Sequence, residues 1–262
     1  MFSAKTYRER RKALKEKVST GLILFFGNED SPMNYADNTY HFRQDSTFLY
    51  YFGIQRPGLI ALLDIDNDRE ILFGDDYTVE DWVWMGPQPT VKHLAESCGV
   101  GQVQPLNELG PSFTRAKNSK QAIHFLPLYR PENKIKLQAL TGIAPDEIAA
   151  KCSIDLVHAV IQQREFKAKE EIEQISRAVD VTVDMHVAAM RCARPGMTEA
   201  EVTAEIHKVA IAAGGNLSFP IIATINGQTL HNHYHGNTLK QGDLLLIDAG
   251  FEDKMGYAGD LS

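Results

Sequence analysis

Residues 244–250 read Leu-Leu-Leu-Ile-Asp-Ala-Gly, and after a short turn residues 257–260 read Tyr-Ala-Gly-Asp. The apolar run is nearly continuous, which is typical of a strand buried on both faces. A turn centred near Lys254 would place Asp248 and Asp260 opposite each other on paired strands, with their Cβ atoms about 4.5–5.5 Å apart. Because an isolated buried carboxylate is costly, two of them at this distance need a cation between them. The stretch therefore predicts a β-hairpin that carries part of a metal centre.

Such a hairpin is suited to metal-dependent hydrolysis. Two divalent ions about 3.5–4 Å apart would neutralise both aspartates and could share a bridging hydroxide as nucleophile. The alternative is that Asp248 ends a strand before a glycine turn and that Asp260 is a surface residue. The spacing alone leaves both interpretations open.

A histidine-rich segment precedes the hairpin. Three of the nine histidines lie within the five residues His231-Asn232-His233-Tyr234-His235. In a strand, all three side chains would point to the same face. Neutral imidazoles bind divalent metals, and a protonated imidazole can polarise a carbonyl group or move a proton. An exposed polar strand without such a role is the alternative.

Composition excludes several functional classes. The 262 residues are 44% hydrophobic and 23% charged, as in globular proteins, and the net charge of -7 argues against a nucleic-acid interface. The one basic cluster, within residues 8–17, also contains Glu9 and Glu16, which predicts a solvated helix face. No Walker-type glycine loop, GxSxG motif or HExxH motif is present, which disfavours most phosphate-binding and serine-hydrolase functions.

We expect a cytoplasmic location. Residues 1–17 lack the apolar core of a secretory signal, and no apolar run approaches the length of a membrane span. The three cysteines, Cys98, Cys152 and Cys192, are far apart and lack paired spacing. They fit inert thiols in a reducing compartment better than a disulfide framework or a zinc site.

The first half of the chain predicts an α/β domain with a mixed sheet, because short apolar runs alternate with helical stretches. We expect strands at 21–27, 47–52, 59–64, 70–73 and 122–126, and helices at 5–17, 79–84, 90–98 and 132–140.

The second half has a different character. A long helix is expected from Lys167 to the sequence Arg194-Pro195-Gly196, where proline and glycine end it. Thr198 then opens a second helix through a capping box, and this helix runs to Gly214. Strands are expected at 219–225, 227–234 and 243–248. The change of pattern predicts two domains, residues 1–160 and 161–262.

Two further groups of residues have weaker functional signals. His41, with Arg43, Gln44 and Asp45, could line a pocket or an interface, although such clusters more often fix a turn. Trp82 and Trp84 could form a hydrophobic contact surface, with core packing as the favoured alternative.

Across essentially its whole length, the sequence resembles the aminopeptidase P (Xaa-Pro aminopeptidase) branch of the pita-bread metallopeptidases, which include prolidase, methionine aminopeptidase and creatinase. Residues 42–53 are similar to the hallmark of that family's N-terminal domain, and residues 194–199 to the turn between the first two catalytic-domain helices. The two aspartate motifs, 247–250 and 257–260, resemble the first two metal-ligand motifs and are the most specific part of the match.

The resemblance implies release of the N-terminal residue from Xaa-Pro peptides at a dimanganese-type centre of Asp, Asp, His, Glu and Glu. Asp248 would bind one metal ion and Asp260 would bridge two. A histidine upstream of the first aspartate contacts the substrate in this family. Leu230-His231 fits the family's Leu-His, whereas His233-Tyr234 with Asn237 fits its His-Tyr-x-x-Asn, so we favour His231 and keep His233 as the alternative.

The sequence departs from the family pattern in two ways. The hairpin between the aspartates is one residue longer, and Ser262 stands where the family has Thr in Asp-x-Thr, before its remaining metal ligands. We therefore expect a truncation of a longer enzyme that is inactive by itself, and a parent protein that forms a homo-oligomer. Prolidase activity and a non-catalytic binding module on the same fold are the alternatives.

Overall fold

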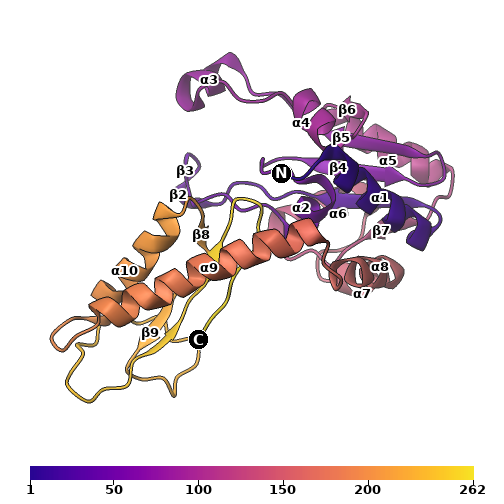
Figure 1. Ribbon diagram of the computed structural model, residues 1–262. Helices are drawn as coiled ribbons and strands as arrows, with labels where there is room; N and C mark the ends of the chain where they lie inside the picture. Colours follow the sequence, from indigo (N-terminus) through magenta and orange to yellow (C-terminus); the bar gives the residue numbers. More distant parts are fainter. The chain divides into compact units, whose positions relative to one another are not determined.

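The computed structural model describes residues 1–262, which form two compact units, residues 1–166 (unit 1) and 167–262 (unit 2). Figure 1 shows their elements. The boundary expected near residue 160 falls inside helix α8 (Ile154–Arg164). This helix stays with unit 1 because Leu156, Ala159 and Val160 belong to its core.

Unit 1 is built on a five-stranded mixed sheet with the strand order β6-β5-β4-β1-β7. Strand β1 is parallel to β7, β5 is parallel to β6, and β4 is antiparallel to both of its neighbours. Every residue of β1 and β4 is buried, which explains their continuous apolar sequences. The strands are β1 (Leu22–Phe26), β4 (Ile60–Asp64), β5 (Arg69–Phe73), β6 (Gln102–Gln104) and β7 (Ile123–Phe125).

Alternate side chains of β1 belong to two separate hydrophobic cores. Ile23 and Phe25 pack with helices α1 (Ala4–Val18), α2 (Ser46–Phe52), α4 (Val91–Cys98) and α8. Leu22, Leu24 and Phe26 pack with the 3₁₀ turn η1 (Leu106–Glu108) and with α5 (Leu109–Asn118), α6 (Pro131–Thr141) and α7 (Ile148–Lys151). The expected α/β class is confirmed. A small hairpin, β2 (Pro32–Tyr35) and β3 (Asn38–Thr39), completes the strands of this unit.

Residues 47–52, expected as a strand, form helix α2 instead. The carboxylate of Asp45 accepts hydrogen bonds from the backbone N–H groups of Thr47 and Phe48, and Gly53 ends the helix with φ +67°. An N-cap and a glycine C-cap favour a helix here over the β propensity of the aromatic residues between them.

The basic segment at the N-terminus is not a solvated helix face throughout, because Arg10 and Arg11 are buried. Arg11 donates from Nε to Glu70 (2.8 Å) and from Nη1 to the carbonyl oxygens of Tyr51 (2.9 Å) and Cys98 (3.1 Å). These partners are distant in sequence, so the charge pattern of the helix could not reveal them.

The tryptophans also differ from expectation. Helix α3 (Val79–Met85) has no buried residue, and Trp82 and Trp84 are 43% and 82% exposed. Core packing was therefore the wrong interpretation. None of the helices combines the length and apolar composition required to cross a membrane.

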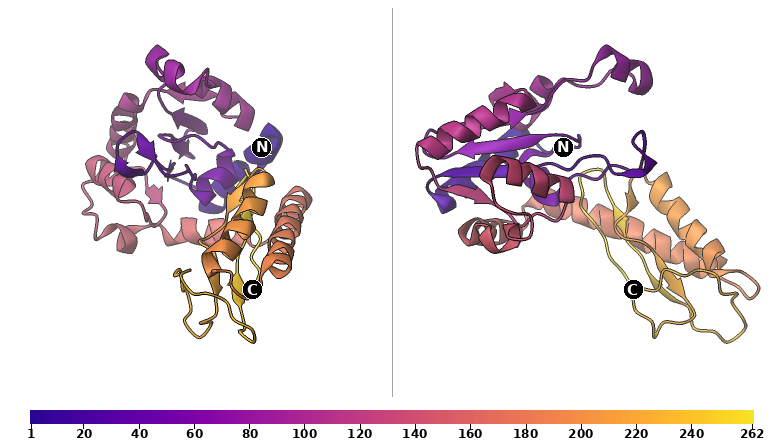
Figure 2. Two further views of the ribbon diagram at one scale, coloured as in Figure 1. Left: turned by 90° about the vertical axis from the view of Figure 1, so that its left-hand side faces the viewer. Right: turned by 180° about the vertical axis from the view of Figure 1, so that it is seen from behind.

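Unit 2 contains the helices α9 (Lys169–Cys192) and α10 (Glu199–Ala212), which pack side by side in the views of Figures 1 and 2. Both expected helices and the Thr198 capping box are confirmed. Four short strands pair antiparallel as β9–β10 and β8–β11. They are β8 (Asn216–Leu217), β9 (Ile222–Thr224), β10 (Leu246–Asp248) and β11 (Phe251–Glu252).

Two strand expectations fail in unit 2. Residues 227–234 form turns and irregular backbone, with His231 at φ +53°, a left-handed conformation that a strand cannot contain. The apolar run before Asp248 is not buried on both faces, since Leu244 and Leu246 are 89% and 41% exposed. Strand β10 pairs only with β9, which leaves its other edge without a neighbouring strand.

Candidate metal centre

The two aspartates lie on one face of the predicted hairpin. Bridges join Ala249 to Leu261 and Glu252 to Ala258. This register places the turn centre at Met255, one residue from the expected Lys254, and Asp260 opposite Gly250, two residues from the expected Asp248. Asp248 and Asp260 are therefore diagonal neighbours on the same face, about 7–8 Å apart, rather than directly opposite. A diagonal pair leaves more room for ions between the carboxylates.

One carboxylate oxygen in the hairpin has no partner. Oδ1 of Asp248 is buried and accepts no hydrogen bond, whereas Asp260 is exposed. A buried oxygen of an ionised carboxylate without a donor is costly, so a cation at this position would remove the cost. The donor set suits a divalent metal ion, because hard carboxylate oxygens are the ligands that Mn²⁺ and similar ions prefer. Within this chain, no group of three or more His, Cys, Asp or Glu side chains is placed to hold a metal.

Helix α9 fixes the backbone directly after Asp248, on both sides of Gly250. The Thr182 hydroxyl accepts from the Phe251 N–H (3.0 Å) and donates to the Ala178 carbonyl (2.9 Å). The buried His186 donates from Nε2 to the Ala249 carbonyl (3.4 Å). Nothing in the local sequence around His186 indicates its contact beside Asp248.

The glycine in each aspartate motif is required by close packing. A Cβ atom on Gly250 would overlap the carbonyl oxygen of Gly259 and the hydroxyl of Ser218. A Cβ atom on Gly259 would overlap the hydroxyl of Thr182 and lie 2.8 Å from the Ala178 carbonyl oxygen. The repeated Ala-Gly therefore lets the two strands of the hairpin approach each other and α9.

The turn of the hairpin is held by its own side chains. Oδ1 of Asp253 accepts from the N–H groups of Met255 and Tyr257, both at 2.9 Å. The Tyr257 hydroxyl donates to the buried Glu171 of α9 (2.9 Å). These bonds fix the direction in which the chain returns toward Asp260.

The three histidines do not share a face, contrary to expectation. His231 and His233 are exposed, whereas His235 is half-buried and bonds through Nε2 to the Ile221 carbonyl (3.1 Å). Between the first two, the Asn232 side chain donates to the Thr224 hydroxyl (3.1 Å). His231 and His233 are thus the two imidazoles of this segment that can meet a ligand.

The polar cluster of unit 1 fixes a turn. Gln44 is fully buried, and its Oε1 accepts from the N–H groups of Asn28 (2.6 Å) and Asp45 (2.9 Å). Its Nε2 donates to the Arg56 carbonyl (2.8 Å), while His41 is exposed. The cluster joins the end of β1 to the start of α2 and offers no catalytic pair.

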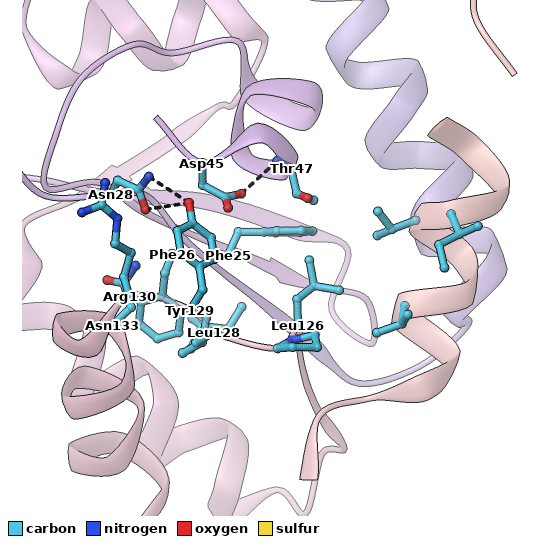
Figure 3. A pocket seen from close by; sticks show the side chains of 15 residues that line it. Phe25, Phe26, Asn28, Asp45, Thr47, Leu126, Leu128, Tyr129, Arg130 and Asn133 are labelled. Carbon is cyan, nitrogen blue, oxygen red and sulfur yellow. Dashed lines mark hydrogen bonds between the residues drawn. The ribbon is translucent and has the colours of Figure 1, made fainter. Parts of the chain in front are cut away.

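A separate cavity of about 280 Å³ lies in unit 1 where β1 and β7 end (Figure 3). Its wall is mainly apolar, and the polar groups at its edge are hydrogen-bonded to one another. Asn28 Nδ2 donates to the Tyr129 hydroxyl (3.0 Å), and the Thr47 N–H donates to Asp45 Oδ1 (2.9 Å). Neither a histidine nor a cysteine lines it. The cavity therefore offers no imidazole or thiol, whereas the aspartates and histidines singled out in the sequence lie in unit 2.

Comparisons with known proteins agree with this division. Residues 7–124 match the aminopeptidase P N-terminal domain, and residues 173–262 match metallopeptidase family M24. The Xaa-Pro aminopeptidase of Escherichia coli (strain K12) is 30% identical over 100% of this chain and 62% of its own length. The Xaa-Pro dipeptidase of Homo sapiens is 24% identical over 88% of this chain and 48% of its own length.

Solved structures show the same architecture. Aminopeptidase P from E. coli with the inhibitor Pro-Leu has a TM-score of 0.82 at 28% identity, covering 99% of this chain and 61% of that one. Proline aminopeptidase P II from Yersinia pestis has a TM-score of 0.84 at 25% identity, with 99% and 62% covered.

The mixed-sheet unit, followed by two helices and an aspartate-bearing hairpin, is the arrangement found in these two-domain metallopeptidase structures. Its sequence matches in both units go further: the chain belongs to the M24 metallopeptidases that carry an aminopeptidase P-type N-terminal domain. It spans 62% of the length of the E. coli relative.

Proposed function

We propose that the natural protein containing this chain is a metal-dependent aminopeptidase that releases the N-terminal residue from peptides with proline in second position. The observation that carries the proposal is the unpartnered, buried Oδ1 of Asp248 on the same face as Asp260, within the part that matches family M24. Relatives named Xaa-Pro aminopeptidase support the substrate class.

The cofactor would be two divalent ions, with Mn²⁺ as our candidate. Asp248 and Asp260 would bind these ions, and ligands from outside this chain would complete their coordination. Such ions lower the pKa of bound water and stabilise negative charge on a carbonyl oxygen. A structure of E. coli aminopeptidase P is described as zinc-substituted, so the choice of metal needs its own measurement.

The exposed imidazoles of His231 and His233 would contact the substrate. A protonated imidazole there can donate a hydrogen bond to the peptide carbonyl oxygen or to the leaving proline nitrogen. Replacing His231 or His233 by Ala in turn, and measuring kcat and KM for each variant, decides which of the two has this role.

The test of the function is substrate length. The natural protein, with Mn²⁺, is given an Xaa-Pro-Xaa tripeptide and an Xaa-Pro dipeptide, and the released N-terminal residue is quantified. Cleavage of the tripeptide supports the aminopeptidase. Cleavage of the dipeptide alone supports the second candidate, a prolidase, which the similarity to the human dipeptidase favours. No cleavage of either would leave the binding module as the better explanation.

The state of the natural protein follows from three simpler measurements. Its intact mass shows whether the polypeptide exceeds the 29.3 kDa of this chain. Its elution in gel filtration tests the proposed homo-oligomer, and fractionation of the source cells tests the cytoplasmic location.

A further inference from the structure

The segment from Ile225 to Asn237, here called the histidine loop, is irregular but held at several points. It begins at the end of β9 and carries both His231 and His233 on its exposed side. A loop without regular backbone pairing needs other partners for its polar groups if its side chains are to keep their positions. Four of its hydrogen bonds converge on the side chain of one residue of helix α10.

That residue is Glu199, whose side chain is fully buried. Oε1 accepts from the Ile225 N–H (2.8 Å) and from Asn237 Nδ2 (3.1 Å). Oε2 accepts from the Asn237 N–H (3.2 Å) and from the same Nδ2 (3.0 Å). One carboxylate therefore joins the first and last residues of the histidine loop.

A second connection reaches the middle of the loop. The buried Thr224 hydroxyl donates to Glu199 and accepts from Asn232 Nδ2 (3.1 Å). Because Asn232 stands between His231 and His233, this relay fixes the backbone from which both imidazoles project. The left-handed φ of His231 lies at this point of the chain.

The loop in turn satisfies the start of helix α10. The N–H groups of Glu199 and Ala200, which have no partner within the helix, donate to the carbonyl oxygens of Asn237 (3.0 Å) and His235 (3.0 Å). Helix and loop therefore order each other.

The carboxylate of Glu199 is ionised in this setting. Burial alone would raise its pKa, but the hydrogen bonds from Ile225, Asn237 and Thr224 together lower it. No salt bridge neutralises this side chain, so its charge is balanced by donors that belong mainly to the loop. Displacing the loop would leave a buried charge without partners, which is strongly unfavourable.

We propose that Glu199 is a positioning residue for the peptidase reaction, which holds the histidine loop so that its substrate-contacting imidazole meets the scissile peptide. The activity part of this proposal rests on the proposed function. In this role, Glu199 contacts neither substrate nor metal and acts only through the histidine loop.

The test uses Glu199→Gln in the natural protein, with Glu201→Gln as its matched control. Gln keeps the size of the side chain but turns an amide N–H₂ toward the donors of Asn237. Glu201 is an exposed carboxylate in the same helical turn that bonds only to Thr198. We expect E199Q to lower kcat/KM about 10- to 100-fold, with unchanged metal content, and E201Q to stay within about twofold. Loss of metal in E199Q would overturn the proposal.

Hydrogen exchange reports on the loop without any need for activity. We expect amides of residues 225–237 to exchange at least about tenfold faster in E199Q than in E201Q. Asn237→Ala, which removes only the side-chain donor, should move exchange in the same direction even if E199Q folds poorly. Equal exchange rates in all variants would show that Glu199 does not hold the histidine loop. This outcome can be read even if the protein cleaves no Xaa-Pro peptide.

A double-mutant cycle separates positioning from general stability. E199Q is combined with His231→Ala and with His233→Ala. In the variant that lacks the substrate-contacting histidine, E199Q should change kcat/KM by less than about twofold, because the imidazole that Glu199 positions is absent. The same 10- to 100-fold loss in both histidine backgrounds would show that Glu199 does not act through them.

Discussion

At the scale of single residues, Asp248 is the one carboxylate with a buried oxygen that has no hydrogen-bond partner. Arg11 is buried with a carboxylate and two carbonyl oxygens as acceptors, and Glu199 is buried among donors. Oδ1 of Asp248, in contrast, is buried without a hydrogen-bond donor. A buried carboxylate oxygen without a hydrogen-bond donor is the expected property of a ligand that binds a cation.

Asp248→Asn should therefore have opposite effects with and without metal. In metal-free protein, removing the unpaired charge should leave the free energy of unfolding equal or higher. With Mn²⁺ at about 100 times its Kd, wild-type protein should gain about 2.7 kcal/mol, and the variant should lose this gain. Thermal unfolding with and without Mn²⁺ measures both, and the exposed Asp180→Asn serves as control. Metal stabilisation that survives in D248N would remove Asp248 from the centre.

Arg11→Ala should be among the most destabilising changes in unit 1. The substitution leaves Glu70 with Lys15 as its remaining cation and leaves two buried carbonyl oxygens without their donor, which costs about 1–3 kcal/mol for each unsatisfied group. The neighbouring Lys12, 76% exposed, should cost less than about 0.5 kcal/mol when changed to Ala. Urea unfolding of both variants gives the comparison, and similar midpoints would contradict the assigned role of Arg11.

At the scale of elements, capping and close approach decide which pattern is realised. The aromatic run of α2 would suit a strand, but Asp45 and Gly53 close it as a helix. The hairpin of unit 2 depends on Gly250 and Gly259, where strand and helix backbones leave no room for a Cβ atom.

Gly250→Ala should destabilise unit 2 by about 1–3 kcal/mol, because its methyl group overlaps rigid backbone. Gly110→Ala in α5, where nothing lies within 4 Å of the added Cβ, should instead stabilise by about 0.4–1 kcal/mol. The sign of the change in unfolding free energy is the readout. A neutral G250A would show that the hairpin and α9 are less closely packed than the structure indicates.

At the scale of the whole molecule, each unit depends on a different buried carboxylate. In unit 1, burial would raise the pKa of Asp64, but hydrogen bonds from Arg69, Gln121 and Asn67 lower it below 3.8. In unit 2, the pKa of Glu199 is lowered below 4.5 in the same way. Since both pKa values are depressed by folding, their stabilisation is present above the unfolded values and is lost as the pH falls through the folded ones.

Acid should therefore weaken both units below about pH 4.5. Asp64→Asn should flatten the pH dependence of the unfolding free energy of unit 1, and Glu199→Gln that of unit 2. Urea unfolding between about pH 3 and 6, followed by probes in each unit, measures the slopes. An unchanged slope in either variant would exclude that carboxylate as the source.

Local sequence patterns were sufficient to predict the α/β class, the helices α1, α9 and α10 with the capping box at Thr198, and the two aspartate motifs as candidate ligands. These features rest on local patterns, namely hydrophobic periodicity, capping chemistry and the paired Ala-Gly, all of which can be read within a few residues.

Other features are seen only in the tertiary structure. They are the diagonal register of Asp248 and Asp260, the burial of Arg11, the exposure of the tryptophans, and the hydrogen bonds between the histidine loop and Glu199. The burial of Arg11 and the position of the histidine loop depend on partners far away in the chain, as Glu70 is from Arg11 and Asn237 is from Glu199. Burial and hydrogen bonding are set by such partners, so no local pattern could specify them.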